Sequence, residues 1–390
     1  MLGPKYIYTT AVDCDTMLPW IHPHLAQSVD PIKGRKLQAS KPIQRGEVLL
    51  LDSPYAIIPT PTPTVDADAE SADSATPILL CSNPLCNRSL PQGTGTPCVN
   101  RCSADVSWCN ETCRETDKPR HDFECTWLAK YSTPLRTKWG EYNFGMLWLI
   151  VRLLARRHVE TQDSSDTNGT SNGTFPTNGT NTDSTTSSLS RLTQTHTTTF
   201  KAGWPAISSL CGTPETWSHA QTREWTVLVK KYLSKTSLPH DLSNADVLGL
   251  ICKEEANSFG LYPRETGVYP QPSVKEQQVG RGEQFGAAVY PRASIANHSC
   301  CPNIIHKPNK TARMVFTAGR DIAAGEECCI SYFDMTQYVS LSERRAHLSG
   351  LFRFKCGCPR CTEEDVDNDG DVEGGDEEMG WGGEGFLGFE

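Results

Sequence analysis

Apolar runs of strand length mark both ends of the chain as β structure. At the N-terminal end they lie within residues 34–58, where a Gly-containing turn at 45–47 separates successive runs. Toward the other end they recur within residues 284–332. Between these two regions the apolar spacing becomes helical, with residues that repeat every three to four positions. The sequence therefore predicts a β fold whose two parts are separated by a long insert.

The helical spacing is clearest after residue 125. Four apolar residues there share one face of a predicted helix: Leu147, Ile150, Val151 and Leu154. Three arginines are expected on its polar side: Arg152, Arg156 and Arg157. Further helices are predicted over 217–233, from Ser243 as N-cap to Phe259, and over 340–351.

Two segments have no apolar period and are too polar to bury a core. Residues 161–199 are rich in Thr, Asn, Ser and Gly, and residues 363–390 are acidic and Gly-rich. We expect the first to be a disordered loop and the second a disordered acidic tail. The tail holds twelve Asp and Glu and no Lys or Arg, so the formal net charge of −9 becomes +3 for residues 1–362. The low isoelectric point therefore describes the tail rather than the folded body.

The chain shows neither a membrane span nor a secretory signal. The most apolar run, residues 144–154, is eleven residues long and contains Arg152, which is too short for a bilayer. Residues 1–30 contain no apolar signal core. We therefore expect a protein of the nucleus, the cytoplasm or both that is not secreted. In that setting seventeen cysteines indicate metal binding rather than disulfides.

Four evenly spaced ligand pairs lie between residues 81 and 125. They are Cys81 and Cys86, Cys98 and Cys102, Cys109 and Cys113, and His121 and Cys125. Eight such ligands suit two tetrahedral zinc sites, which would supply folding energy to a segment with few aliphatic residues. The alternative without metal is a cluster of buried free thiols with a nearby histidine. A RING finger is another, but its characteristic Cys-x-His in the middle is absent.

A second cysteine group closes the folded part of the sequence. Cys356, Cys358 and Cys361 offer three thiolates, and Cys300 in the run Asn297-His298-Ser299-Cys300 is the candidate fourth. Such a site would bring Asn297 and His298 close to three aromatic residues: Tyr332, Phe352 and Phe354. An isolated terminal metal knuckle is the alternative. The six cysteines outside both groups, which are Cys14, Cys211, Cys252, Cys301, Cys328 and Cys329, are expected to be small hydrophobic residues.

Together these motifs resemble the SET domain, a lysine methyltransferase fold, followed by its cysteine-rich post-SET segment. The ordered elements are Gly34-Arg35-Lys36, Asn257-Ser258-Phe259, the Asn-His-Ser-Cys run, Gly325-Glu326-Glu327 and the terminal cysteines. The ligand pairs that end in His-x3-Cys resemble a MYND zinc finger, and the nested arrangement is similar to SMYD-type proteins. The resemblance implies interleaved ligands, with Cys81, Cys86, Cys109 and Cys113 on one zinc and Cys98, Cys102, His121 and Cys125 on the other.

The fold class expected is α+β, with short β-sheets split by the finger and a helical insert. The expected parts are an N-terminal SET part over 1–80, a MYND finger over 81–125 and a helical insert over 126–250. A C-terminal SET part over 251–335, a post-SET zinc segment over 336–362 and the acidic tail follow. The larger relatives continue into a helical repeat domain, whereas this sequence ends about 29 residues after Cys361, so we expect a short form.

The resemblance implies S-adenosylmethionine as methyl donor and a protein lysine as acceptor, with a histone tail as one candidate substrate. Implied donor contacts are Asn297 and His298, with Arg35 and Asn257 at its amino-acid end and Phe354 on its adenine. Tyr332 and Phe352 would line the lysine channel. Phe352 stands where relatives often carry a tyrosine, which predicts tolerance of a higher methylation state.

Lys36 replaces the second glycine of the family's cofactor loop and supports an alternative function that is not enzymatic. In that alternative the chain is a zinc scaffold that binds partners without binding the donor. Proline-rich or other peptides are the partners expected for the finger, and the acidic tail could attract a basic partner such as a histone tail. DNA binding is not expected, because the body carries about +3 and lacks a basic recognition helix. A monomer is expected.

Overall fold

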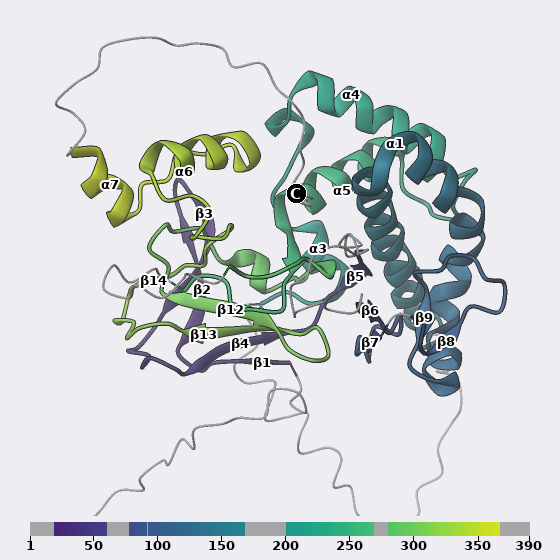
Figure 1. Cartoon of the computed structure of the whole chain (residues 1–390), viewed down its shortest axis with the longest axis horizontal. Helices are drawn as coiled ribbons and strands as arrows, with labels where there is room; N and C mark the ends of the chain where they lie inside the picture. The colour runs from purple at the N-terminus through teal and green to yellow at the C-terminus, as the bar shows by residue number, and fades with distance from the viewer. Residues whose placement is uncertain (1–18, 61–77, 92, 168–199, 269–279, 367–390) are drawn as a thin grey trace, which may run out of the picture.

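The computed structural model describes residues 19–60, 78–91, 93–167, 200–268 and 280–366 (Figure 1). The strands are Trp20–Ile21 (β1), Leu25–Asp30 (β2), Gly34–Ala39 (β3), Val48–Asp52 (β4), Ala56–Pro59 (β5), Ile78–Leu80 (β6), Ser89–Pro91 (β7), Thr96–Pro97 (β8), Ser107–Trp108 (β9), Ser258–Leu261 (β10), Gly286–Val289 (β11), Ile304–Pro308 (β12), Met314–Ala318 (β13) and Glu327–Cys328 (β14). The helices are Glu111–Thr167 (α1), Gly203–Ser208 (α3), His219–Leu228 (α4), Asn244–Asn257 (α5), Leu341–His347 (α6) and Pro359–Val366 (α7). This is the mixed fold of short sheets and helices that the sequence predicts.

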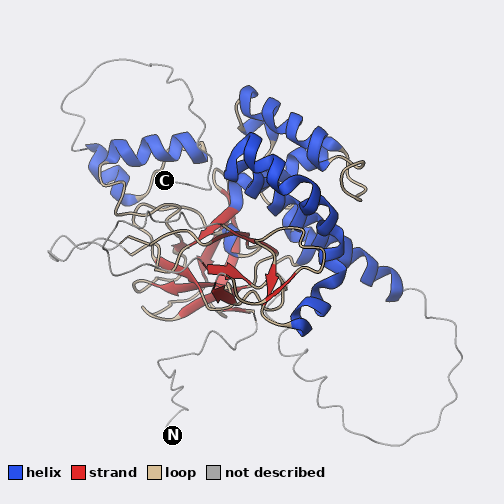
Figure 2. Ribbon diagram, turned by 45° about the vertical axis from the view of Figure 1, so that its right-hand side comes forward, coloured by secondary structure: helices blue, strands red, loops and turns tan. Residues whose placement is uncertain are grey.

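Each of the three larger sheets combines strands from both ends of the sequence. Their orders are β1-β4-β13-β12, β14-β3-β2 and β10-β11-β5, and neighbouring strands are antiparallel. The continuous apolar run 48–51 forms β4, which is central in its sheet and buried on both faces. Figure 2 shows the helices of the insert gathered to one side of these strands. The two β regions therefore fold as one body around the insert.

Helix α1 is two helices that meet at Gly140. The backbone there has φ 81° and ψ 171°, a left-handed φ that favours glycine. The two halves contact each other through Trp148, whose Nε1 donates a 3.0 Å hydrogen bond to Glu124. His121 and Cys125 lie on the first half.

Several predicted boundaries are confirmed. Ser243 caps α5 through a capping box with Asp246, and Ser340 caps α6 through one with Glu343. The side chain at each cap accepts a hydrogen bond from a backbone N–H that the first helical turn leaves unpaired. α5 ends at Asn257, and the chain turns there directly into β10.

Other predictions were wrong. Arg152 is not on a polar face: it is 3% exposed, because its guanidinium finds buried carboxylate and carbonyl partners. At the end of the β region expected within 284–332, the last strand stops at Cys328 in β14, and Ile330 forms only an isolated bridge with His298. Helix α1 continues to Thr167, into the segment expected to be a loop, and α7 includes the first residues of the segment expected to be a tail. The remainder of both segments, 168–199 and 367–390, lies outside the described residues.

Among the described residues, no helix combines the length and the apolar character needed to cross a membrane.

Candidate active site and metal centres

The Asn-His-Ser-Cys run lies directly beside the segment that leads to Tyr332. The amide of Ser299 donates to the carbonyl of Ile330 at 2.9 Å, and the amide of Ile330 donates to the carbonyl of Asn297 at 3.0 Å. Asn303 fixes the same register, because its side chain donates to the Glu327 carbonyl and accepts from the Cys329 amide, each at 2.8 Å. Two motifs thirty residues apart in sequence are thus held side by side by backbone hydrogen bonds.

Tyr332 lies at the centre of an aromatic cluster. Its ring centroid is 4.9 Å from that of Phe352, 6.3 Å from that of Phe354 and 5.2 Å from that of His298. Its hydroxyl donates a 3.0 Å hydrogen bond to the carbonyl of Ala296. Burial raises the pKa of the Tyr332 phenol above its ordinary value, so the group stays protonated near neutral pH.

The side chain of His298 is held from both ring nitrogens. Nδ1 accepts a 3.1 Å hydrogen bond from the amide of Tyr332, and Nε2 lies 3.2 Å from the sulfur of Cys300. Burial lowers the pKa of His298 to about 3, so the imidazole is neutral. The ring therefore fixes Tyr332 relative to Cys300, and its nitrogens already have neighbours within this chain.

Arg35, Asn297 and Asn257 lie around one place, although they come from distant parts of the sequence. The amide nitrogen of Asn297 donates to the carbonyl of Arg35 at 3.3 Å and to Glu327 at 2.9 Å. The guanidinium of Arg35 reaches Ser209 at 3.3 Å. The backbone carbonyl of Asn257 accepts from Ser294, three residues before Asn297, at 3.1 Å.

Sequence reasoning missed the segment between α3 and α4. Cys211 was expected to be a small buried hydrophobe, but it is exposed, and its thiol donates to the side-chain oxygen of Asn257 at 3.4 Å. The amide nitrogen of Asn257 donates in turn to the Cys211 carbonyl at 2.9 Å. No motif marks this segment, so its place beside Asn257 and Arg35 could be found only from the tertiary structure. Glu327, by contrast, stands inside a motif that the sequence had singled out.

Lys36 lies on β3, where its ammonium is 3.7 Å from the carboxylate of Asp30 on the paired strand β2. Gly34, two residues earlier, has φ 75° and open space where a Cβ would stand. The ammonium of Lys36 is therefore held within the β2–β3 hairpin.

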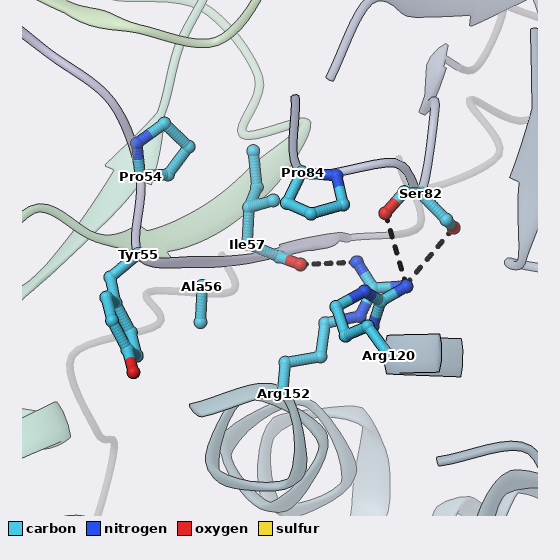
Figure 3. A pocket seen from close by; sticks show the side chains of 8 residues that line it. All are labelled: Pro54, Tyr55, Ala56, Ile57, Ser82, Pro84, Arg120 and Arg152. Atoms are coloured by element: carbon cyan, nitrogen blue, oxygen red, sulfur yellow. Dashed lines mark hydrogen bonds between the residues drawn. The ribbon is translucent and has the colours of Figure 1, made fainter. Parts of the chain in front are cut away.

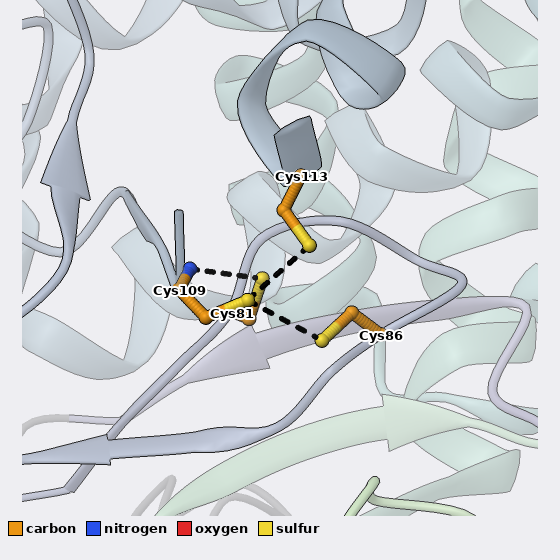
Figure 4. A group of neighbouring side chains, drawn as sticks. All are labelled: Cys81, Cys86, Cys109 and Cys113. Atoms are coloured by element: carbon orange, nitrogen blue, oxygen red, sulfur yellow. Dashed lines mark hydrogen bonds between the residues drawn. The ribbon is translucent and has the colours of Figure 1, made fainter. Parts of the chain in front are cut away.

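Three groups of four ligand residues have converging ligand atoms. They are Cys81, Cys86, Cys109 and Cys113; Cys98, Cys102, His121 and Cys125; and Cys300, Cys356, Cys358 and Cys361. Within each group the ligand atoms lie within 4.8 Å of one another. Figure 4 shows the sulfur atoms of the first group pointing toward one another. The structure thus brings together the same sets that the spacing and the resemblance implied.

One sulfur–sulfur distance in each of the first two groups fits tetrahedral zinc, whereas Cys109 and Cys113 lie closer, at 3.2 Å. Bonds of about 2.3 Å from zinc to sulfur place neighbouring sulfurs about 3.8 Å apart. The Cys86–Cys109 and Cys98–Cys125 sulfur distances are 3.8 and 3.6 Å. Nε2 of His121 faces the sulfur of Cys98 at 3.2 Å. The donor sets, four thiols twice and three thiols with one imidazole, are those of closed structural zinc sites.

Comparisons with known proteins agree with this geometry. The family model described as SET domain matches residues 34–333, so the chain belongs to the SET-domain family. A SET and MYND domain-containing protein of Dictyostelium discoideum is 25% identical over 86% of this chain and 59% of its own length. The N-lysine methyltransferase SMYD2-A of Xenopus laevis is 23% identical over 86% of this chain and 60% of its own length.

Shorter and more distant similarities also occur. The human histone-lysine N-methyltransferase SMYD3 is 38% identical over 25% of this chain and 22% of its own length. A crystal structure of the SET domain of LSMT bound to lysine and AdoHcy matches 80% of this chain and 49% of its own chain, with TM-score 0.31 and 15% identity. The Dictyostelium and Xenopus relatives match most of this chain, but the chain spans only about 60% of the length of each of them.

Proposed function

We propose that this chain is an S-adenosylmethionine-dependent protein-lysine N-methyltransferase. Membership of the SET-domain family and its methyltransferase relatives support the reaction class. The observation that carries the proposal is the cluster around Tyr332, where the phenol lies against Phe352 and Phe354 and its proton is directed at a backbone carbonyl.

The cluster suits a lysine side chain because it can hold the amine in its neutral form. Free lysine has a pKa of about 10.4 and is protonated at neutral pH. Desolvation between aromatic rings lowers that pKa, so burial of the amine beside Tyr332 favours loss of its proton. The Tyr332 hydroxyl donates to Ala296, and its oxygen lone pairs are thus available to accept from the substrate N–H. Tyr332 would orient the amine, and catalysis would come mainly from alignment.

The residues around Arg35 and Asn257 suit the methyl donor. S-adenosylmethionine, when bound, supplies a methyl group from its sulfonium centre. We assign its amino-acid end to Arg35 and Asn257, its further polar contacts to Asn297 and to the backbone of His298, and its adenine to Phe354. Asn257 is well prepared for this role, because its amide nitrogen donates to two backbone carbonyls and its orientation is therefore fixed.

The metal groups have structural roles in this proposal. Two zinc ions would hold a MYND finger over 81–125, and one would hold the post-SET segment over 336–362. The domain boundaries given above are part of the proposal. The post-SET zinc would place Phe352 and Phe354 against Tyr332, since Cys356 follows Phe354 by two residues. A peptide partner for the finger, a histone or other protein substrate, and a location in the nucleus or cytoplasm also belong to the proposal.

A scaffold without donor affinity is the second candidate, and Lys36 is the residue that favours it. The experiment that separates the two is calorimetric titration of the full chain with S-adenosylmethionine, because a scaffold shows no binding at millimolar donor. A radiolabelled-donor assay on histones and cell lysate, with Tyr332→Phe as control, then tests the reaction. Donor binding and label incorporation that depends on Tyr332 support the enzyme. Absence of both overturns it.

A further inference from the structure

Two buried arginines lie where the ligand-rich segment 81–125 meets sheet β10-β11-β5. Arg120 is 6% exposed and Arg152 is 3% exposed, and both contact Ser82, which directly follows Cys81. Figure 3 shows their guanidinium groups between Ser82 and the carbonyl of Ile57, at the base of a small pocket that also includes Pro54 and Tyr55. The arrangement joins elements that are far apart in sequence.

An anion site at this pocket would be the simplest interpretation, but the charges exclude it. Arg120 pairs with Asp117 at 2.6 Å and with Glu124 at 2.9 Å. Arg152 pairs with Glu124 at 3.2 Å. Two buried carboxylates thus balance two buried guanidinium groups, and no positive charge remains for a ligand. The arginines therefore have a structural role, which follows from the groups that they join.

Glu124 connects the arginines to a metal group. Its side chain is fully buried, and one carboxylate oxygen lies 3.1 Å from Nδ1 of His121. The other ring nitrogen of His121 faces the sulfurs of Cys98 and Cys102, at 3.2 and 3.7 Å. A carboxylate on the outer nitrogen of a metal-ligating histidine fixes the ring orientation and its tautomer. Trp148 donates to the second carboxylate oxygen at 3.0 Å, so Glu124 itself is held firmly.

Arg152 connects Glu124 to the sheet beside the cofactor residues. One of its terminal nitrogens donates to the carbonyl of Ile57 in β5, and the other donates to the Ser82 hydroxyl at 3.2 Å. Ile57 pairs with Ala288 in β11, which pairs with Phe259 in β10. β10 begins immediately after Asn257. A short path of direct contacts therefore leads from the Cys98 group to the proposed donor site.

We propose that Glu124 and Arg152 are positioning residues that couple the metal group of Cys98, Cys102, His121 and Cys125 to sheet β10-β11-β5. The segment 81–125 is then an integral part of the catalytic body. Metal in this group stabilises the end of the sheet from which Asn257 extends. This inference rests on the proposed zinc sites and on the proposed donor site, and its tests do not require methyltransferase activity.

The first test measures zinc release from the zinc-loaded full chain into a competing chelator. We expect Glu124→Gln to lose one of three zinc ions at about 10- to 100-fold lower chelator concentration, which is the usual effect of removing an outer partner of a ligand histidine. Arg152→Met should likewise lower the chelator concentration at which the same zinc ion is released. Arg156→Met is the matched control, because Arg156 lies one turn further along α1 with its side chain 32% exposed, and it should leave all three ions unchanged.

The second test measures amide hydrogen exchange in β5 and β10. Chelation of the parent protein, Glu124→Gln and Arg152→Met should each speed exchange in these strands, while β4 and β13 keep their protection. Arg152→Lys keeps the charge but loses the planar fork that reaches Ile57 and Ser82 together, so it tests the link even if Arg152→Met does not fold. The inference is overturned if the folded variants keep both the zinc release and the hydrogen exchange of the parent protein. It is also overturned if chelation leaves hydrogen exchange in β5 and β10 of the parent unchanged. A parent that binds no donor but shows the zinc-linked exchange overturns the enzyme proposal alone.

Discussion

Arg353 and Gln221 are joined across 132 positions of sequence: the guanidinium of Arg353 donates a 3.1 Å hydrogen bond to the side-chain oxygen of Gln221. Arg353 also lies over the ring of Trp217, with 5.8 Å between the guanidinium carbon and the ring centroid. It stands between Phe352 and Phe354, in a left-handed conformation with φ 61°. The contact therefore holds the segment carrying both aromatic residues against helix α4.

Removing this contact should loosen the proposed lysine channel. We expect Arg353→Ala to raise the KM for peptide about fivefold with little change in kcat, because a partly buried charged hydrogen bond contributes about 1 kcal/mol. Initial-rate kinetics with zinc analysis measure this effect. Gln221→Ala should give a similar shift, and the double variant should add little to either. Lys355→Ala, two residues away and 72% exposed, is the control. Fully additive effects would show that the two residues act separately.

The hydroxyl of Tyr332 should be essential for turnover. Tyr332→Phe is expected to lower kcat about 100-fold, a loss typical of removing one oriented polar group from an active site. Folding stability should fall by about 1 kcal/mol, because the Ala296 carbonyl loses its partner. Rates with labelled donor and thermal unfolding of both proteins measure the two effects. A variant that retains the parent kcat would remove Tyr332 from the mechanism.

Phe352 should set how many methyl groups are added. Its ring lies 4.9 Å from that of Tyr332 and carries no second hydroxyl to hold a water molecule, so we expect the site to accept a methylated amine. Mass spectrometry of the product should show di- or trimethyl-lysine for the parent and mainly monomethyl-lysine for Phe352→Tyr. Monomethyl-lysine as the sole parent product would contradict this prediction.

Loss of the terminal metal group should disable the site without unfolding the whole chain. Cys356→Ser is expected to bind two zinc ions instead of three by elemental analysis, and to lose activity because Phe352 and Phe354 lose their anchor. Cys301→Ser is the matched control, since Cys301 neighbours Cys300 but lies outside the group. Three zinc ions in Cys356→Ser would exclude it as a ligand.

Gly212 should be indispensable for the segment beside Asn257. Its φ is 110°, and a Cβ there would stand 2.3 Å from the carbonyl oxygen of Cys252. Gly212→Ala is therefore expected to lower the free energy of unfolding by about 2 kcal/mol or more and to weaken donor binding. Gly249→Ala, in α5 with open space at the Cβ position, should instead stabilise the protein slightly. Chemical denaturation and calorimetry measure both variants. Equal stability of the two variants would contradict the prediction.

Elements that depend on local chemistry were predictable from the amino-acid sequence alone. Ligand spacing predicted the pairs of cysteines and the His121–Cys125 pair, since two residues a few positions apart can reach one metal ion, and the resemblance to a MYND finger implied which pairs share an ion. Ser243 and Ser340 predicted helix starts, because a capping side chain acts on the turn that follows it. The ordered motifs predicted that Asn297, His298 and Tyr332 meet.

Which charged side chains are buried and which cysteines are exposed depends on contacts between elements that are distant in sequence. Arg152 reads as a surface residue of an amphipathic helix, yet it is buried, because Glu124 and the Ile57 carbonyl offer partners that are distant in sequence. Cys211 reads as a small hydrophobe, yet it lies exposed beside Asn257. Periodicity reports which face of a helix is apolar, but the partners that make a buried charge tolerable come from other elements. Their positions follow from the packing of the whole chain.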